Sequence, residues 1–193
     1  MGEKPRVLAW AGSTRKESFN KKLVRIAARA AEQAGAEVTL IDLADFRMPL
    51  FDQDLEAASG QPESAKQLKR LMVEHEGFLI SAPEYNSSVT GVLKNAIDWV
   101  SRPVPGEPKL VAFQGKTAAL MSASPGALGG LRGLVHLRAI LGNIGVLVLP
   151  GQVAVSKAHE AFDGEGRLND GKQQSGIEAL GTELAGILEK LRG

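Results

Sequence analysis

Short apolar runs alternate with longer amphipathic segments along almost the whole chain. The runs have the length of buried strands, and we predict strands at residues 6–10, 37–43, 77–82, 116–122 and 146–149. Between them apolar residues recur at helical spacing, which predicts helices at residues 20–34, 63–75, 90–101, 136–141 and 177–191. The Pro- and Gly-rich segment 102–115 and the polar segment 162–171 are predicted to be connections.

Strands that alternate with helices in this way predict a parallel sheet with helices on both faces. Right-handed crossovers and five strands favour a doubly wound α/β sheet with the strand order 2-1-3-4-5. The sequence contains no internal repeat, charge block or interdomain linker. We therefore predict a single domain over residues 1–193.

Two polar loops follow the first and third predicted strands. Residues 11–20 read Ala-Gly-Ser-Thr-Arg-Lys-Glu-Ser-Phe-Asn, and residues 83–88 read Pro-Glu-Tyr-Asn-Ser-Ser. Both loops leave the carboxyl ends of buried strands, which is where an open α/β sheet places its ligand. We expect the two loops to form one site.

The first loop has the groups that bind an anion. Arg15 can bond a phosphate with two N–H groups, and Ser13, Thr14 and Ser18 add hydroxyls. Asn20 is predicted to cap the following helix, whose free amides and dipole also attract an anion. The alternative is an ordinary capped turn with solvated charges.

Other phosphate-binding and catalytic motifs do not match this sequence. Only Gly12 of a Gly-x-Gly-x-x-Gly fingerprint follows the first strand. Gly115-Lys116-Thr117 resembles the end of a Walker A loop, but Leu110 replaces its first glycine and a strand follows it. The Gly-x-Ser-x-Gly elbow of α/β-hydrolases is absent.

The second loop offers groups suited to a planar ring. Pro83 keeps the chain extended after the strand, and Tyr85, the only tyrosine in the protein, lies beside Asn86. Gly91 allows a close approach of the backbone. A Tyr-Asn corner packed for structure alone is the alternative.

Composition excludes several functions. The formal net charge of +1 gives no field that would attract nucleic acid or an anionic membrane. The chain has no cysteine, so disulfides, thiolate metal sites and a cysteine nucleophile are ruled out. His75 and His159 lie in no metal-ligand pattern, and no apolar run predicts a signal peptide or a membrane helix. We expect a cytoplasmic protein with no bound metal.

The loops and the third helix together resemble the NADPH-dependent FMN reductase family of flavodoxin-like proteins, which includes quinone, chromate and azo reductases. The motifs that carry the resemblance are Gly12-Ser13-x-Arg15-x-x-Ser18-x-Asn20, Pro83-Glu84-Tyr85-Asn86-x-Ser88 and Gly91-x-Leu93-Lys94-Asn95-Ala96-Ile97-Asp98-Trp99. It extends to Gly129-Gly130-Leu131-Arg132 and His136-Leu137-Arg138 and so spans most of the first 150 residues. Ser87, Pro125 and the insertion 103–108 depart from the family pattern.

The resemblance implies a site for FMN. Its phosphate would be held by Ser13, Arg15, Ser18 and Asn20, with Thr14 and Phe19 in the same loop. Its ring would be lined by Pro83, Glu84, Tyr85 and Asn86, and closed on the other side by Ser122, Ala123, Ser124 and Gly126. For His136, packing or a capping hydrogen bond is the simpler interpretation, against contact with the ligand or a second subunit.

The resemblance also implies an enzyme that takes hydride from NADPH or NADH and reduces a small acceptor by ping-pong transfer, with no catalytic side chain. Quinones, chromate, azo or nitro compounds and free flavin are candidate acceptors. A homodimer or homotetramer is expected. The remaining alternatives are a flavodoxin-type electron carrier, which the +1 charge disfavours, and a regulatory or binding module of the same fold.

Overall fold

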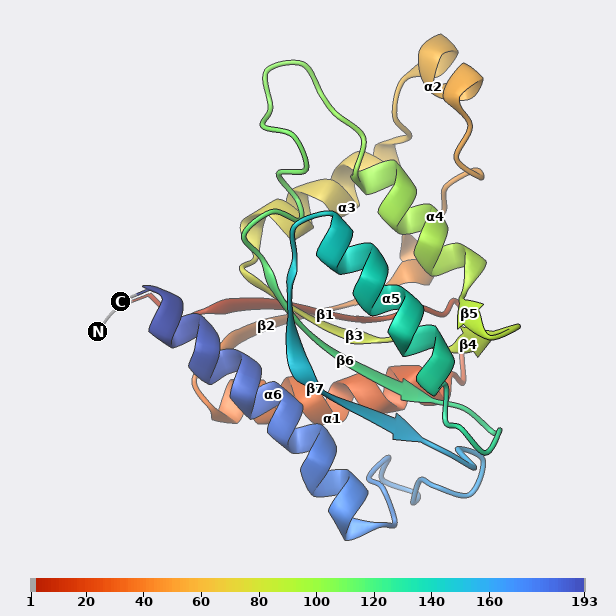
Figure 1. Ribbon diagram of the computed structural model, residues 1–193, viewed down its shortest axis with the longest axis vertical. Coiled ribbons are helices and arrows are strands. Elements are labelled where there is room, and N and C mark those ends of the chain that lie inside the picture. The colour runs from red at the N-terminus through yellow and green to blue at the C-terminus, as the bar shows by residue number, and fades with distance from the viewer. Residues whose placement is uncertain (1–2, 193) are drawn as a thin grey trace.

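The computed structural model describes residues 3–192 and contains a five-stranded parallel sheet with helices on both faces (Figure 1). The sheet strands are β1 (Arg6–Ala11), β2 (Glu37–Asp42), β3 (Gly77–Ser81), β6 (Thr117–Ala123) and β7 (Leu147–Val155). Their order is β2-β1-β3-β6-β7, which confirms the predicted order 2-1-3-4-5.

The helices are α1 (Phe19–Gln33), α2 (Gln53–Ser59), α3 (Glu63–Glu74), α4 (Gly91–Val100), α5 (Leu131–Asn143) and α6 (Gly171–Arg192). A short 3-10 turn, η1 (Leu43–Asp45), follows β2, and a small antiparallel hairpin pairs β4 (Glu84–Tyr85) with β5 (Ser88–Val89). All five predicted helices are present. The structure adds α2 and the hairpin, both of which lie in segments predicted to be loops.

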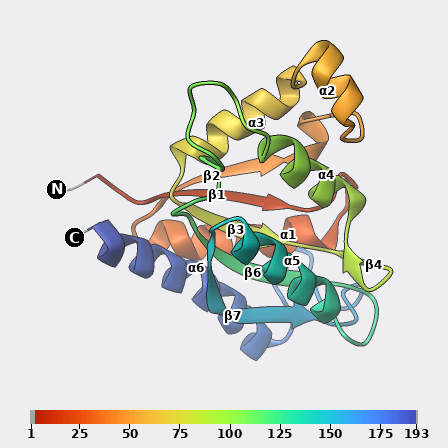
Figure 2. The same ribbon diagram turned by 45° about the horizontal axis from the view of Figure 1, so that its top comes forward.

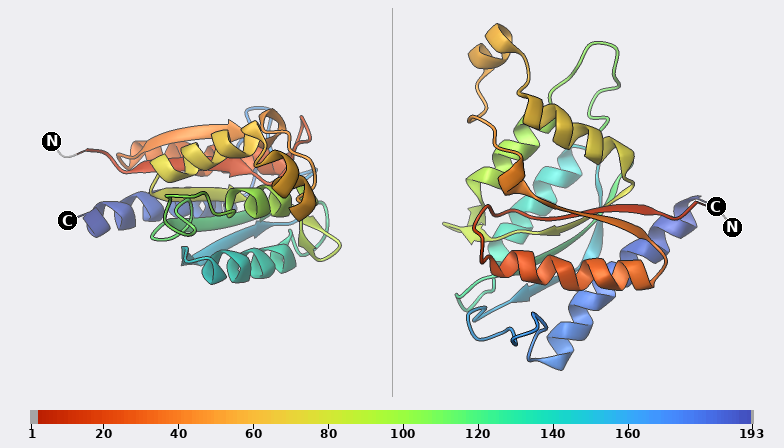
Figure 3. Two further views of the ribbon diagram at one scale, coloured as in Figure 1. Left: turned by 90° about the horizontal axis from the view of Figure 1, so that it is seen from above. Right: turned by 180° about the vertical axis from the view of Figure 1, so that it is seen from behind.

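The core forms two layers because side chains alternate across each strand. Val7, Ala9 and Leu79 face α1 and α6, whereas Leu8 and Phe78 face α3, α4 and α5. The view from above shows α3, α4 and α5 in front of the sheet and α6 behind it (Figure 3). Trp99 is fully buried, with its ring edge-to-face against Phe51 and its indole N–H donating to Pro49 O (2.8 Å).

The last sheet strand is longer than the sequence predicts. The predicted strand ends at residue 149, but β7 continues through Pro150-Gly151 to Val155 with a shift of register opposite Ala118 and Leu120. An edge strand tolerates a proline because one side of it needs no ladder donors. Arg138 of α5 also donates to the carbonyls of Leu149 (2.8 Å) and Pro150 (3.4 Å), which supports the irregular segment.

Two helices begin earlier than predicted. α5 starts at Leu131 rather than residue 136, directly after Gly130, whose φ of 96° favours glycine. α6 starts at Gly171 rather than residue 177, since the Asp170 carboxylate accepts the N–H groups of Lys172 and Gln173. Both starts depend on local capping that apolar periodicity does not reveal.

Two segments project from the sheet, and Arg192 near the end of the described chain contacts Glu3 near its start. α2 and the connection between α4 and β6 extend from the same end of the molecule (Figures 1 and 2). At the opposite side, Arg192 at the end of α6 pairs with Glu76 (2.6 Å) just before β3. This pair attaches the last helix to the amino-terminal ends of the strands.

Candidate functional site

The predicted loops meet at the carboxyl ends of β1, β3 and β6. Ala11, Ser81 and Met121 are aligned in register, so the three strands end at one edge of the sheet. The Gly12 N–H donates to Ser81 O (2.9 Å), and the Thr90 hydroxyl, which caps α4, donates to Gly12 O (2.6 Å). These bonds join the first loop to the second.

Asn20 fixes the relative positions of these strand ends. Its side-chain amide donates to Ala123 O (2.8 Å) and accepts from Ala123 N–H (2.9 Å) and from the Ser81 hydroxyl (2.8 Å). The prediction that Asn20 caps α1 is wrong, because Ser18 occupies the capping position and Asn20 lies inside the helix. Asn20 is buried and bonds to backbone and side chains from distant parts of the sequence.

The first loop presents an uncompensated positive charge. Arg15 is exposed and lies over the Phe19 ring at 5.1 Å, and within residues 3–192 it forms no ion pair with a carboxylate. The first turn of α1 has no acidic residue, and the Ser18 side chain makes no capping bond. A cation, nearby hydroxyls and a helix whose first turn has no acidic residue form a surface suited to a phosphate.

The second loop is the β4–β5 hairpin. Asn86 and Ser87 form its turn with φ values of 50° and 66°, as a tight hairpin with two left-handed residues requires. Tyr85 is 59% exposed, an unusual degree for a tyrosine side chain, and it faces the first loop across two hollows. Periodicity could not reveal a hairpin of two-residue strands.

Helix α5 holds this hairpin from behind. Arg132 donates to the Glu84 carboxylate at 2.6 Å, the Gly133 N–H donates to the same group at 3.1 Å, and His136 Nδ1 lies 2.9 Å from the Ser88 hydroxyl. Burial raises the pKa of Glu84, but the bonds from Arg132 and Gly133 outweigh it, and the pKa lies below its ordinary value. Glu84 is therefore a charged anchor of the hairpin, and the exposed His136 contacts the hairpin through Ser88.

The loop after β6 closes the site from a third side. Ser122 is fully buried, and no protein donor or acceptor in the described chain reaches its hydroxyl. Gly130 covers it so closely that a Cβ there would lie 1.9 Å from the Ser122 Oγ. Ser124 is half-buried and Gly126 is exposed. The part of this loop that can contact a ligand therefore lies after Ser122.

Two neighbouring hollows lie between these loops. The smaller, about 70 Å³, contains ten of the predicted site residues: Ser13, Arg15, Ser18, Phe19, Asn20, Pro83, Glu84, Tyr85, Ala123 and Ser124. The second, about 290 Å³, adds Thr14 and Gly91 together with Thr90 and Val92, of which the last two were not indicated by the sequence as site residues. Asn86, Ser122 and Gly126 line neither hollow.

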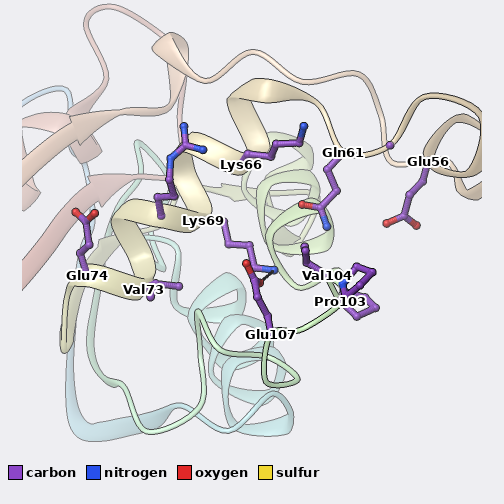
Figure 4. A pocket seen from close by; sticks show the side chains of 12 residues that line it. Glu56, Gln61, Lys66, Lys69, Val73, Glu74, Pro103, Val104 and Glu107 are labelled. Carbon is purple, nitrogen blue, oxygen red and sulfur yellow. Dashed lines mark ion pairs between the residues drawn. The ribbon is translucent and has the colours of Figure 1, made fainter.

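The described chain contains neither a metal-ligand cluster nor a membrane-spanning helix. Among residues 3–192, no three His, Asp or Glu side chains are grouped so that they could hold a metal ion. No helix in this range is long and apolar enough to cross a membrane. A further cavity, about 580 Å³, lies beside α3 (Figure 4) and shares no lining residue with the two hollows.

Comparison with known proteins gives concordant results. The family model for NADPH-dependent FMN reductases matches residues 5–160. The chain is 36% identical over 194 residues to the NAD(P)H-dependent FMN reductase PA1204 of Pseudomonas aeruginosa, covering 100% of both chains. It is 38% identical over 149 residues to the quinone reductase of Escherichia coli K12, covering 77% of this chain and 76% of that protein.

Solved structures agree with the sequence matches. The flavoenzyme NAD(P)H:(acceptor) oxidoreductase FerB of Paracoccus denitrificans superposes with a TM-score of 0.81 at 30% identity, over 96% of this chain and 98% of that one. An archaeal flavodoxin superposes with a TM-score of 0.62 at 10% identity, over 95% and 99% of the two chains, which shows the shared fold alone.

Proposed function

Because this chain belongs to the NADPH-dependent FMN reductase family, we propose that it binds FMN between the three loops and uses it to pass electrons from NAD(P)H to a small acceptor. One structural observation carries the placement of the site. The unpaired Arg15 and the exposed Tyr85 face the same pair of hollows at the carboxyl edge of the sheet.

The residues present fit both parts of the cofactor. Arg15 and the hydroxyls of Ser13, Thr14 and Ser18 would hold the phosphate, because they are polar groups that no carboxylate neutralises. Pro83, Tyr85 and the backbone of the hairpin would lie along the ring, with Ser124 on the opposite side. Asn20 would act indirectly, since its amide already joins β3 and β6.

Bound FMN would supply the hydride chemistry, and the chain would bind and orient it. Glu84 is the one carboxylate along the two hollows, and its pairing with Arg132 commits it to holding the hairpin. The remaining side chains would act by positioning the ring and the two substrates. On this proposal no side chain of the two hollows serves as a catalytic acid or base.

The open side of the site would serve both substrates in turn. Quinones, chromate, azo or nitro compounds and free flavin remain the candidate acceptors. Initial rates with NADPH and a benzoquinone should give parallel double-reciprocal lines, as ping-pong turnover requires. Converging lines would show that both substrates are bound at the same time, and would contradict the proposal that they use the same side of the site in turn.

The phosphate assignment is tested by Arg15→Ala. Loss of a charge-assisted contact of about 1.5–3 kcal/mol should weaken FMN binding by about tenfold to a hundredfold. Fluorescence titration of FMN into the purified protein measures the change, and circular dichroism checks the fold. Arg29→Ala is the matched control, because Arg29 is exposed in α1, the helix that follows the Arg15 loop, and lines neither hollow. Equal affinity in both variants would contradict the assignment.

We also propose a homodimer or homotetramer. Leu50 is 80% exposed, and Leu128, Leu131 and Val135 are 50%, 41% and 57% exposed near the hairpin, as in a surface that a second subunit covers. The apolar side of α4, in contrast, is buried against its own sheet. Sedimentation velocity should show an assembly larger than 20.4 kDa, and Val135→Asp should dissociate it. A monomeric wild-type protein would refute this assembly.

A further inference from the structure

Two phenylalanine rings lie beside the charged group of the first loop. The Arg15 guanidinium lies over the Phe19 ring at 5.1 Å, and that ring stacks on Phe162 with centroids 6.1 Å apart and planes 5° from parallel. These distances suit a cation within about 6 Å of a ring and an aromatic pair at about 4.5–7 Å. The three side chains form one stack, of which Phe162 alone lines neither hollow.

Phe162 is held by a tight turn between β7 and α6. The Asp163 carboxylate accepts the N–H groups of Glu165 and Arg167, both at 2.9 Å, and the Asp163 N–H donates to Arg167 O at 2.8 Å. Phe162 itself pairs with Leu168 across this turn as an antiparallel bridge. Its side chain packs against the core layer formed with α1 and α6. Backbone and ring are therefore both fixed.

The segment that carries Phe162 is also bonded to the third loop of the site. The Ala158 N–H donates to Ser124 O at 3.1 Å, and the Ser124 N–H donates to Val155 O at 3.0 Å. Ser124 lines the smaller hollow. Backbone hydrogen bonds thus set the position of this segment relative to the site.

Arg15 needs a support of this kind because no carboxylate within residues 3–192 forms an ion pair with it. A free arginine side chain loses rotamer freedom when a ligand fixes it, and a side chain that is already ordered loses less. Phe19 is only half-buried, so the stacked ring of Phe162 limits the positions that Phe19 can take. The order of Arg15 therefore depends on both rings.

We propose that Phe162 is a positioning residue for the flavin phosphate, acting through Phe19 on Arg15. The inference rests on the FMN site proposed above and adds to it a residue from the segment between β7 and α6. Phe162 does not line the hollows, so its contribution reaches the ligand through Arg15 alone. It should therefore matter for a flavin that carries a phosphate and not for one that lacks it.

FMN and riboflavin differ only in the phosphate and so measure its contribution. Each is titrated by fluorescence into flavin-free, full-length protein. Phe162→Leu should weaken FMN binding about twofold to fivefold, as expected for one cation–π contact at an exposed site, and leave riboflavin binding unchanged. Phe162→Tyr keeps the ring and should retain the wild-type preference for FMN. The ratio of the two affinities is insensitive to a smaller folded fraction, because both flavins bind the same folded protein.

A double variant tests the path. In protein that already carries Arg15→Ala, Phe162→Leu should not weaken FMN binding further, because the group that it positions is gone. Lys22 Nζ also lies over the Phe162 ring, at 5.8 Å, and Lys22→Met combined with Phe162→Leu should give additive effects. Ile187→Ala is the matched control. Ile187 is partly buried against the same core layer and lines neither hollow, so its loss should leave the preference for FMN unchanged.

Several results would overturn this inference while leaving the FMN site in place. Unchanged FMN binding in Phe162→Leu, or an equal loss for FMN and riboflavin, would show that the ring has no role specific to the phosphate. Additive effects of Phe162→Leu and Arg15→Ala would exclude Arg15 as the group it positions, and coupling to Lys22→Met would assign the effect to Lys22. Wild-type protein that bound neither flavin, or both equally, would overturn the proposed phosphate site and this inference with it.

Discussion

At the scale of single residues, the site depends on side chains that hold loops in place as much as on those that face the ligand. Asn20 links α1 to the ends of β3 and β6 through three hydrogen bonds. Glu84 does the same for the hairpin through Arg132 and Gly133. Arg15 and Tyr85 can face the same hollows because these anchors fix the backbone beneath them.

Asn20→Asp tests the first anchor. The new carboxylate would oppose Ala123 O instead of donating to it, in a buried position, and stability should fall by about 2–4 kcal/mol. Urea unfolding followed by circular dichroism measures the loss. Asn143→Asp makes the same chemical change at an exposed position and should cost about 0.5 kcal/mol or less. Similar values for both would argue against the anchoring role.

At the scale of elements, α1 and α6 cover one face of the sheet and pack against each other with their backbones very close. A Cβ on Gly181 would lie 2.0 Å from Ala27 O, which is a backbone atom that cannot move without moving α1. Gly186, in the same helix, has open space around its Cα. Gly181 is therefore required by the close packing of α6 against α1, whereas no contact in the described chain requires a glycine at position 186.

Substitution of each glycine by alanine should change the stability in opposite directions. Gly181→Ala should destabilise the protein by about 1–3 kcal/mol or more, because the helices must move apart. Gly186→Ala should stabilise it by up to about 1 kcal/mol through helix propensity. Thermal unfolding of both variants measures the difference. A shift in the same direction would show that α1 and α6 do not pack as closely as described.

At the scale of the whole molecule, carboxylates with lowered pKa values join distant parts of the chain. Burial raises the pKa of Glu76, but the Arg6 N–H and Arg192 outweigh it, and the net shift is downward from 4.5. Burial likewise raises the pKa of Asp42, and the bond from Lys21 with its other partners brings the pKa below 3.8. For Glu84, burial also raises the pKa, and the bonds from Arg132 and Gly133 bring it below 4.5.

These shifts predict a loss of stability in acid. The unfolded chain binds protons at higher pH than the folded chain, so the free energy of unfolding should fall as pH drops through 4.5 and below. Arg132→Met should remove the share due to Glu84 and give a shallower decline than the wild type. Urea unfolding between pH 7 and pH 3 tests this, with Arg29→Met as the control. An unchanged slope would contradict the role of Arg132.

The strand order and the meeting of the two polar loops at one edge of the sheet were predictable because both rest on local patterns. Each buried strand is a compact apolar run, and the loops after β1 and β3 contain polar residues whose chemistry can be recognised without coordinates. The same reasoning missed α2 and the β4–β5 hairpin, which have too few residues for periodicity to be visible. It also ended the last strand at Leu149, before Pro150, where an edge position and Arg138 allow the strand to continue.

By itself the sequence determined the doubly wound sheet, the two site loops and the likeness to FMN reductases, since these follow from residue order and spacing. Only the tertiary structure decided what Asn20 bonds, that Ser122 is buried beneath Gly130, and that Glu84 is paired with Arg132. It alone revealed the cavity beside α3. The physical reason is separation along the chain: Asn20 and Ala123 lie 103 positions apart, and no local pattern encodes such a contact.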